Sequence, residues 1–225
     1  MADALQEETA DVLARLIQFD TVNPPGDERA CQEWLRDYLT EAGLECELDG
    51  TEPERPNLVA TLAGEQPGPV LGYLSHVDTV LADAGDWTHD PWSGAIHDGF
   101  LWGRGALDMK SQTAAEAVAA ARLARDGWRP AKGALKVFSV VDEETGGIKG
   151  AKWLCENRPD LARAGITLIF SPAEMIVGAT VTPSVGSNRA ARRGSVSEMR
   201  ASEPSGSSGS SPIARRNARG SSVTS

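Results

Sequence analysis

The sequence is poor in the residues that mark secreted and membrane proteins. Its cysteines, Cys31, Cys46 and Cys155, are odd in number and lack the spacing of a metal site, which favours a reducing compartment. Residues 1–8 are acidic and lack the basic and apolar regions of a secretory signal. No apolar run approaches the roughly 20 residues that span a bilayer. We therefore expect a cytoplasmic protein with no membrane partner and no cysteine nucleophile.

Positive charge and histidine are also scarce. Lysine and arginine number 22 against 32 aspartates and glutamates, and the net charge of −10 argues against a nucleic-acid partner. Only three histidines occur, His76, His89 and His97. Hydrophobic residues, in contrast, make up 40% of the 225 residues, which is enough for the core of one sizeable domain or of a domain with an appendage.

Helix-type and strand-type apolar patterns alternate along the first three quarters of the chain. Such alternation indicates an α/β fold. A long loop rich in tryptophan separates the second strand from the third helix. The expected helices are residues 5–19, 27–41, 108–125 and 150–157, the expected strands are 58–62, 70–74, 135–141 and 166–170, and the loop is 84–98.

The composition changes near the C-terminus. Residues 178–225 contain 13 serines and seven arginines against two acids, and no aromatic residue follows Phe170. Residues 205–211 consist of serine and glycine alone. A segment of this kind cannot bury enough apolar surface to offset the entropy of ordering it. The sequence predicts a folded part over residues 1–177 and a disordered tail over 178–225.

Two expected strands end in side chains that can bind metal ions. His76 and Asp78 follow strand 70–74, and the three acids of residues 142–144 follow strand 135–141. Ligands of open α/β sheets bind beyond the carboxyl ends of the strands, so this coincidence points to a metallohydrolase. Asp108 adds a further acid, at the expected start of a helix that follows a glycine-rich turn.

Each of these residues also has a plainer interpretation. His76 could bind zinc while Asp78 holds its ring, or it could be a satisfied histidine at a strand end. Asp108 could bridge two cations, or it could simply be an N-cap. Glu143 and Glu144 could divide proton transfer and metal binding between them, or belong to an acidic loop. We expect His89 and His97 to be non-ligands.

Taken together, the motifs resemble those of the di-zinc exopeptidase and deacylase family. That family includes acetylornithine deacetylase, succinyl-diaminopimelate desuccinylase, aminoacylase and glutamate carboxypeptidase. The resemblance covers about residues 5–165 and keeps the family's order. The matching segments are Thr-Val-Asn-Pro-Pro-Gly-Asp-Glu (21–28), Ser-His-Val-Asp-Thr-Val (75–80), Trp-x-x-Asp-Pro-Trp-Ser-Gly (87–94), Gly-Arg-Gly-Ala-Leu-Asp-Met-Lys (103–110) and Asp-Glu-Glu-Thr-Gly-Gly (142–147).

The resemblance implies a three-layer α/β/α catalytic domain and a site that hydrolyses amide bonds in peptides or N-acyl amino acids. By the match of motifs, His76 binds one zinc ion and Asp78 orients it. Asp108 bridges both ions, Glu143 is the general base and Glu144 binds the second ion. The family uses two zinc ions, and a single ion or cobalt is the alternative for this chain.

The chain also departs from the family. A further acidic ligand is needed, and Glu174 is the nearest acid after the strand expected at 166–170. The family's late histidine ligand has no counterpart, and its lid or dimerisation domain is missing, which leaves the oligomeric state open. The amino-acid composition of the tail resembles that of a GC-rich gene translated out of frame. We therefore expect a partial catalytic domain over residues 1–177, impaired in catalysis, with a non-catalytic metal- or peptide-binding fragment as the alternative.

Overall fold

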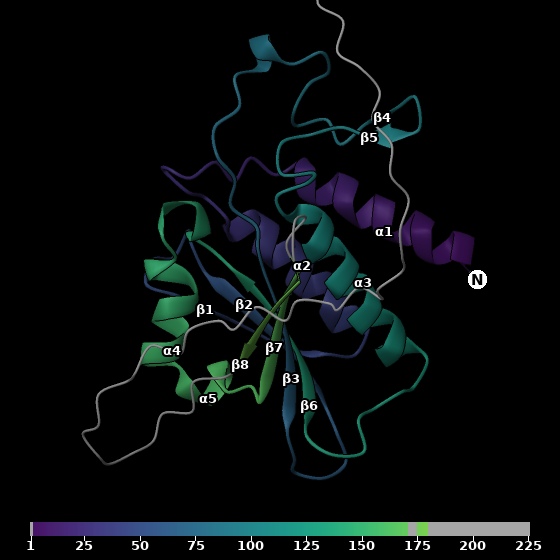
Figure 1. The fold of residues 1–225 in the computed structure, drawn as a ribbon, viewed down its shortest axis with the longest axis vertical. Coiled ribbons are helices and arrows are strands. Elements are labelled where there is room, and N and C mark those ends of the chain that lie inside the picture. Colours follow the sequence, from purple (N-terminus) through teal and green to yellow (C-terminus); the bar gives the residue numbers. More distant parts are fainter. Residues whose placement is uncertain (1, 171–174, 180–225) are drawn as a thin grey trace, which may run out of the picture. The chain divides into compact units, whose positions relative to one another are not determined.

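A six-stranded mixed sheet is the centre of this computed structural model, which describes residues 2–170 and 175–179, all within a unit that spans residues 1–184 (Figure 1). The strand order is β1-β2-β6-β3-β7-β8. Strands β6, β3 and β7 run parallel, and the other neighbouring pairs are antiparallel. The strands are β1 Glu45–Asp49, β2 Asn57–Ala63, β3 Val70–His76, β6 Ala134–Val140, β7 Ile166–Phe170 and β8 Met175–Ala179.

Helices cover both faces of the sheet, which gives the three-layer α/β/α architecture that the sequence predicts. Figure 1 shows α1 and α3 on the side of the sheet opposite to α4 and α5. A separate two-stranded ribbon, β4 with β5, lies in the connection between β3 and α3. The helices are α1 Ala2–Ile17, α2 Arg29–Glu41, α3 Lys110–Arg125, α4 Trp153–Asn157 and α5 Pro159–Ala162, and the ribbon strands are β4 Ile96–His97 and β5 Phe100–Leu101.

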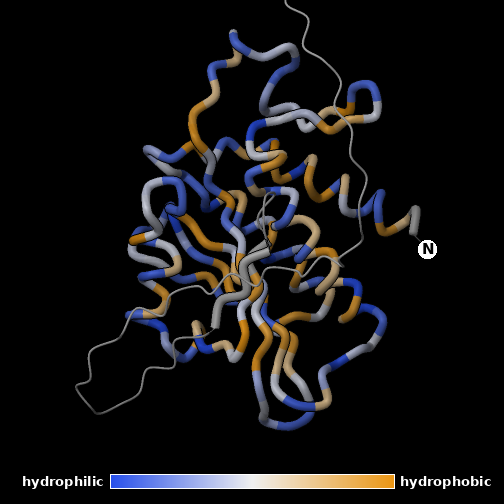
Figure 2. The backbone as a smooth tube through the Cα atoms, in the orientation of Figure 1, coloured by the Kyte–Doolittle hydropathy of each residue, from blue (hydrophilic) through white to orange (hydrophobic). Residues whose placement is uncertain are grey.

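Strand periodicity explains the two layers. Alternate residues of β6 point to opposite faces, so Leu135 and Val137 pack under α2 and α3, whereas Phe138 and Val140 pack under α4 and α5. Both sets are buried, which is why apolar residues predominate on both faces of β6. Figure 2 shows hydrophobic segments in the strands and hydrophilic segments in the turns between them.

The alanine-rich helix α3 packs closely on the sheet because its inner side chains are small. Ala114, Ala117, Val118 and Ala121 recur at helical spacing and are fully buried. Helix α2 contributes larger anchors, Leu35 and Leu39 among them, and burying one such side chain is worth about 1.5–3 kcal/mol. No helix in the described residues is long and apolar enough to cross a membrane.

Most of the expected elements are present within a few residues of their predicted bounds. The helix expected at 150–157 is preceded by one wide turn, Ile148–Lys152, in which Gly150 departs from helical geometry. Strands β1 and β8, helix α5 and the β4–β5 ribbon were not predicted from the sequence. Strand β8 ends at Ala179, so it includes the first two residues of the predicted tail. The rest of that prediction, and Glu174, lie outside the described residues.

Candidate metal centre

The strand ends that carry the predicted site residues are neighbours in the sheet. Strands β3 and β6 are parallel, and their last paired residues are His76 and Val140. Beyond β6 the chain enters a short 3-10 helix, Glu143–Thr145, which brings the acidic motif to the same edge as His76. The first turn of α3 is tied to this edge because the Thr113 hydroxyl donates a hydrogen bond to the His76 carbonyl at 3.1 Å.

His76 faces two carboxylates through one ring nitrogen. Its Nε2 atom lies 3.4 Å from Oδ1 of Asp108 and 3.6 Å from Oε2 of Glu143. The imidazole is almost fully buried, whereas the side chains of Asp108 and Glu143 are 70% and 58% exposed. The three side chains therefore meet where the buried sheet edge opens to solvent.

The opposite side of the imidazole is held by Asp78. Its backbone carbonyl lies 3.0 Å from Nδ1 of His76, and its Oδ1 lies 3.4 Å from the same atom. A carbonyl oxygen only accepts hydrogen bonds, so Nδ1 carries the proton. In the neutral imidazole this leaves the lone pair of Nε2 free for a cation.

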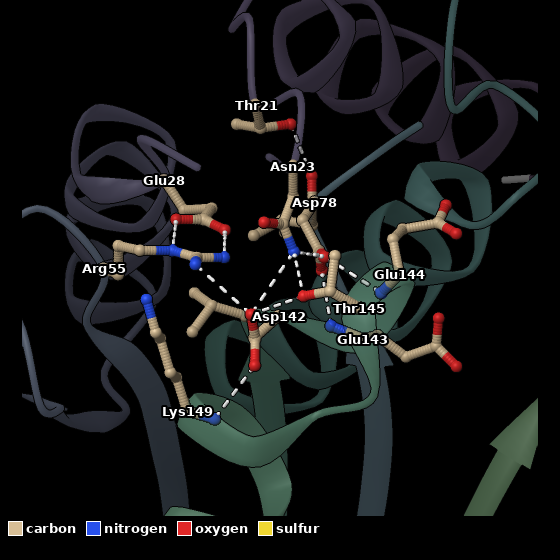
Figure 3. A network of polar contacts seen from close by, with 12 residues as sticks. Thr21, Asn23, Glu28, Arg55, Asp78, Asp142, Glu143, Glu144, Thr145 and Lys149 are labelled. Carbon is tan, nitrogen blue, oxygen red and sulfur yellow. Dashed lines mark hydrogen bonds and ion pairs between the residues drawn. The ribbon is translucent and has the colours of Figure 1, made fainter. Parts of the chain in front are cut away.

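The Asp78 carboxylate also holds the acidic turn. Its two oxygens accept hydrogen bonds from the backbone N–H groups of Glu143, at 3.2 Å, and Glu144, at 3.1 Å (Figure 3). The side chain is fully buried. A single carboxylate thus fixes both the ring of His76 and the backbone from which the two glutamates project.

The electrostatic field at this edge favours a positive charge. Burial alone would lower the pKa of His76, but its hydrogen bond and charge interaction with Asp78, together with the charge of Glu143, raise that pKa to about 9. Burial would raise the pKa of Asp78, but its bonds to His76 and Asn23 lower it. The pKa of Glu144 is raised by burial and by neighbouring acids, although the charge of His76 opposes the shift.

The structure corrects one expectation about Asp108. Helix α3 begins at Lys110, Met109 occupies the N-cap position, and no side chain caps the helix there. Asp108 is therefore not an N-cap, because it lies one residue too early, and the main chain turns its carboxylate toward His76 instead. Helix capping, the alternative interpretation of Asp108, is therefore wrong.

The spacing of two donors fits a bound metal ion. Ligand atoms on a tetrahedral zinc ion, with bonds of about 2.0–2.2 Å, lie roughly 3.3–3.6 Å apart. The distance of 3.4 Å between Nε2 of His76 and Oδ1 of Asp108 falls in that range. Within residues 2–170 and 175–179, however, no group of three or more histidine, cysteine or acidic side chains is arranged to hold a metal ion.

Glu144 contributes to the site differently from Glu143. Its backbone is fixed by Asp78 and its carboxyl group interacts electrostatically with His76 and Asp108, but Glu143 is the glutamate that lies near Nε2 of His76. The histidines outside the site stack on each other, with 3.7 Å between the ring centres of His89 and His97. Burial raises the pKa of the Cys31 thiol to about 11, which makes it a poor nucleophile.

Sequence reasoning missed several buried polar residues behind the site. Asn23 belongs to the motif of residues 21–28, but its amide contacts with Asp78 and Asp142 depend on partners far along the chain. Asp142, the first of the three acids in its motif, is 4% exposed and has a left-handed backbone with φ of 68°. Glu28 ends the motif that contains Asn23, but its pairing with Arg55, which lies in no motif, has no local signal.

Comparison with known proteins identifies the family. A family-wide profile of Peptidase family M20/M25/M40 matches residues 72–216, so the chain belongs to this family of hydrolases. The match runs into the predicted tail. Succinyl-diaminopimelate desuccinylase of Psychrobacter arcticus is 34% identical over 150 residues, which cover 63% of this chain and 35% of that protein. The enzyme of the same name from Paracoccus denitrificans is 39% identical over 148 residues, covering 65% of this chain and 37% of the relative.

Solved structures share the fold. Human carnosine dipeptidase 1 has a TM-score of 0.63 at 20% identity, covering 74% of this chain and 39% of that one. An M20 family metallo-carboxypeptidase from Sulfolobus solfataricus has a TM-score of 0.62 at 19% identity, covering 72% and 37%. These comparisons confirm the predicted family and fold class. The chain spans little more than a third of the length of the curated relatives.

Proposed function

We propose that the chain carries part of the catalytic centre of a metal-dependent hydrolase of amide bonds in peptides or N-acyl amino acids. The observation that carries this proposal is the spacing of Nε2 of His76 and Oδ1 of Asp108, 3.4 Å apart at the open end of the sheet. Metal ions are implied by membership of a metallopeptidase family. Zinc is the proposed ion because it accepts both imidazole and carboxylate donors.

The proposed ligands are His76, Asp108 and Glu144, with Glu174, which lies outside the described residues, as a further candidate. A bound zinc ion supplies polarisation of the amide carbonyl and activation of water for attack. Glu143 is the proposed general base, because its exposed carboxylate faces the space beside Nε2 of His76. Asp78 keeps the proton on Nδ1 of His76 and so presents the other nitrogen to the cation.

A non-catalytic metal-binding role is the second candidate. It is favoured by the absence, within the described residues, of a third donor arranged around the same point as His76 and Asp108. The high exposure of Asp108 and Glu143 also leaves the reacting atoms open to water. For the same reasons we propose that amide turnover is impaired in this form of the chain. The cytoplasmic location is likewise a proposal, supported by three cysteines that are all unpaired.

The test is zinc binding by the purified 225-residue chain, measured by equilibrium dialysis and calorimetry, with His76→Ala and His89→Ala compared. His89 is the control because it is a histidine in a loop and is not a proposed ligand, whereas His76, at the end of β3, is one. We expect the wild type and His89→Ala to bind zinc and His76→Ala to lose it. Equal zinc binding by all three proteins would contradict the proposed metal centre.

The same samples distinguish the two candidate functions. Each is assayed with added zinc on N-acyl amino acids, N-succinyl compounds among them, and on dipeptides. Slow, zinc-dependent turnover that disappears in His76→Ala supports an impaired hydrolase, and zinc binding without any turnover supports the non-catalytic role. Turnover near the usual enzyme value of about 10 per second would contradict the proposed impairment.

A further inference from the structure

A buried ion pair lies behind the candidate metal centre. The guanidinium group of Arg55 donates hydrogen bonds to both carboxylate oxygens of Glu28, at 2.9 and 2.7 Å. The side chains are 3% and 0% exposed. The desolvation cost of such a pair can exceed its attraction, and well-packed apolar residues often serve stability as well or better. Fold stability is therefore a weak explanation for burying two full charges here.

The same guanidinium extends the contact toward the acidic motif. Its Nη1 atom lies 3.2 Å from Oδ1 of Asp142. Asp142 has a left-handed backbone, and its carboxylate accepts hydrogen bonds from the Thr145 hydroxyl at 2.7 Å and the Lys149 backbone N–H at 3.0 Å. Asp142 thus closes the turn that contains Glu143 and Glu144, and Arg55 holds the carboxylate that closes it.

Asn23 joins this turn to the residue that orients His76. Its side-chain amide lies 2.9 Å from Oδ2 of Asp78, 3.4 Å from Oδ1 of Asp142 and 3.1 Å from the Thr145 hydroxyl. Figure 3 shows Arg55, Asp142, Asn23 and Asp78 as one continuous polar network. In the same view the side chains of Glu143 and Glu144 point away from it.

The main chain leaves the guanidinium little freedom. Gly26 has a left-handed φ of 82°, and a Cβ atom there would lie 2.3 Å from Cζ of Arg55. The absence of a side chain at this position lets the backbone of the proline-containing motif cover the guanidinium closely. Arg55 is therefore held by Glu28 on one side, by Asp142 on another and by the Gly26 backbone.

We propose that Glu28 and Arg55 are positioning residues, which act through Asp142 to set the backbone turn that presents Glu143 and Glu144 beside His76. The inference rests on the proposed metal centre, which it deepens. Neither residue touches the reacting atoms. A planar fork that contacts two separate carboxylates suits this task better than a lysine, which offers a single point charge.

The test replaces the pair by apolar residues of similar size, Glu28→Leu with Arg55→Met, in the 225-residue chain. The control, Arg29→Met with Glu33→Leu, removes a neighbouring ion pair that is 3.0 Å long and about two fifths exposed. Three measurements are made: the denaturation midpoint, the zinc dissociation constant, and the chemical shifts and exchange rates of the Glu143 and Glu144 amides.

We expect the apolar pair to fold, with a midpoint lowered because buried Asp142 loses its cationic partner, and to bind zinc about 10–100-fold more weakly, the loss typical of residues that support a metal ligand. The amide signals of Glu143 and Glu144 should shift and exchange faster, because their hydrogen bonds to Asp78 loosen. The control should match the wild type throughout. Wild-type zinc affinity and unchanged amide signals in the folded apolar pair would overturn the proposal.

A conservative variant covers the case in which the apolar pair fails to fold. Arg55→Lys keeps the charge but cannot contact Glu28 and Asp142 with one planar group, so zinc affinity should fall about 3–10-fold in a folded protein. Unchanged affinity and amide signals in that variant would likewise overturn the proposal. If the wild type itself binds no zinc, the proposed metal centre fails, whereas the amide signals still decide whether Arg55 positions the turn.

Discussion

The Oδ1 atom of Asp78 lies 3.4 Å from Nδ1 of His76, and the carboxylate that carries it is fully buried. Asp78→Asn keeps the size of the side chain but removes the charge that favours a cation on His76. We expect zinc affinity to fall about 10–100-fold, as for other changes behind metal ligands. Calorimetry with zinc measures the effect, and Asp37→Asn, an exposed change on α2, is the matched control. Equal affinities for the wild type and Asp78→Asn would contradict the orienting role.

The two glutamates of the acidic turn should differ in what their loss removes. Glu143→Gln is expected to retain zinc and lose the residual turnover, because Glu143 is the proposed base, whereas Glu144→Gln is expected to weaken zinc binding. Metal content after dialysis and turnover of an N-acyl amino acid are measured on the same preparations. Since Glu143 is the glutamate near Nε2 of His76, loss of zinc in Glu143→Gln alone would mean that the two roles are exchanged.

A buried acid on α3 should make stability depend on pH. Glu116 is 4% exposed, and burial raises its pKa to about 8 from a usual 4.5, with the nearby Ser75 hydroxyl opposing the shift only in part. Between these two values the folded protein holds a proton that the unfolded chain releases. Below pH 4.5 both states hold this proton, so Glu116 costs no stability there. As the pH rises from 4.5 toward 8, its effect lowers the free energy of unfolding by about 1.4 kcal/mol per pH unit.

Glu116→Gln should abolish this decline. Urea denaturation at several pH values between 5 and 8 gives the free energy of unfolding for the wild type, Glu116→Gln and Glu41→Gln, an exposed control at the end of α2. We expect the free energy of unfolding of Glu116→Gln to increase relative to that of the wild type as the pH rises. The control should show the same pH dependence as the wild type. Parallel pH profiles for all three proteins would show that Glu116 is ionised in the fold.

The sequence predicted the sheet edge because the signals there are local. An apolar run identifies β6 as a buried strand, and the polar residues that follow β3 and β6 fall at one edge once those strands are parallel neighbours. Strand β1 was missed because its sequence, Glu-Cys-Glu-Leu-Asp, alternates charged with less polar residues and only half of it is shielded from solvent. An antiparallel strand at a sheet edge leaves no continuous apolar run to detect.

The inner polar network could not be predicted, because its partners are far apart in the chain. Asn23 and Asp142 are 119 positions apart, and Glu28 and Arg55 are 27 apart with a helix and a strand between them. The start of α3 was misplaced for a related reason. A capping rule uses local sequence, whereas this helix is anchored by tertiary contacts of Lys110 and Thr113.

The last prediction concerns the lysine at the end of the Gly-Arg-Gly motif. Lys110 is fully buried, and its ammonium group donates hydrogen bonds to the carbonyls of Leu16, at 2.9 Å, and Phe19, at 3.0 Å. It thereby satisfies carbonyl groups at the C-terminal end of α1 and ties that helix to α3. This placement indicates a structural task for a residue whose motif otherwise belongs to the candidate site.

Lys110→Met should therefore lower the free energy of unfolding by about 1–3 kcal/mol, since the Phe19 carbonyl loses this donor and the Leu16 carbonyl keeps only the Phe19 N–H, at 3.3 Å. Lys132→Met, at an exposed turn, should change it by less than about 0.5 kcal/mol. Urea denaturation at pH 7 measures both values. Zinc affinity, measured at low temperature where each variant is folded, should stay within about threefold of the wild type. The ammonium group of Lys110 hydrogen-bonds to the carbonyls of Leu16 and Phe19, and among the described contacts its interaction with Asp78 is one of charge without a hydrogen bond. If the folded Lys110→Met protein no longer binds zinc, Lys110 supports the metal centre and its role is not limited to the packing of α1.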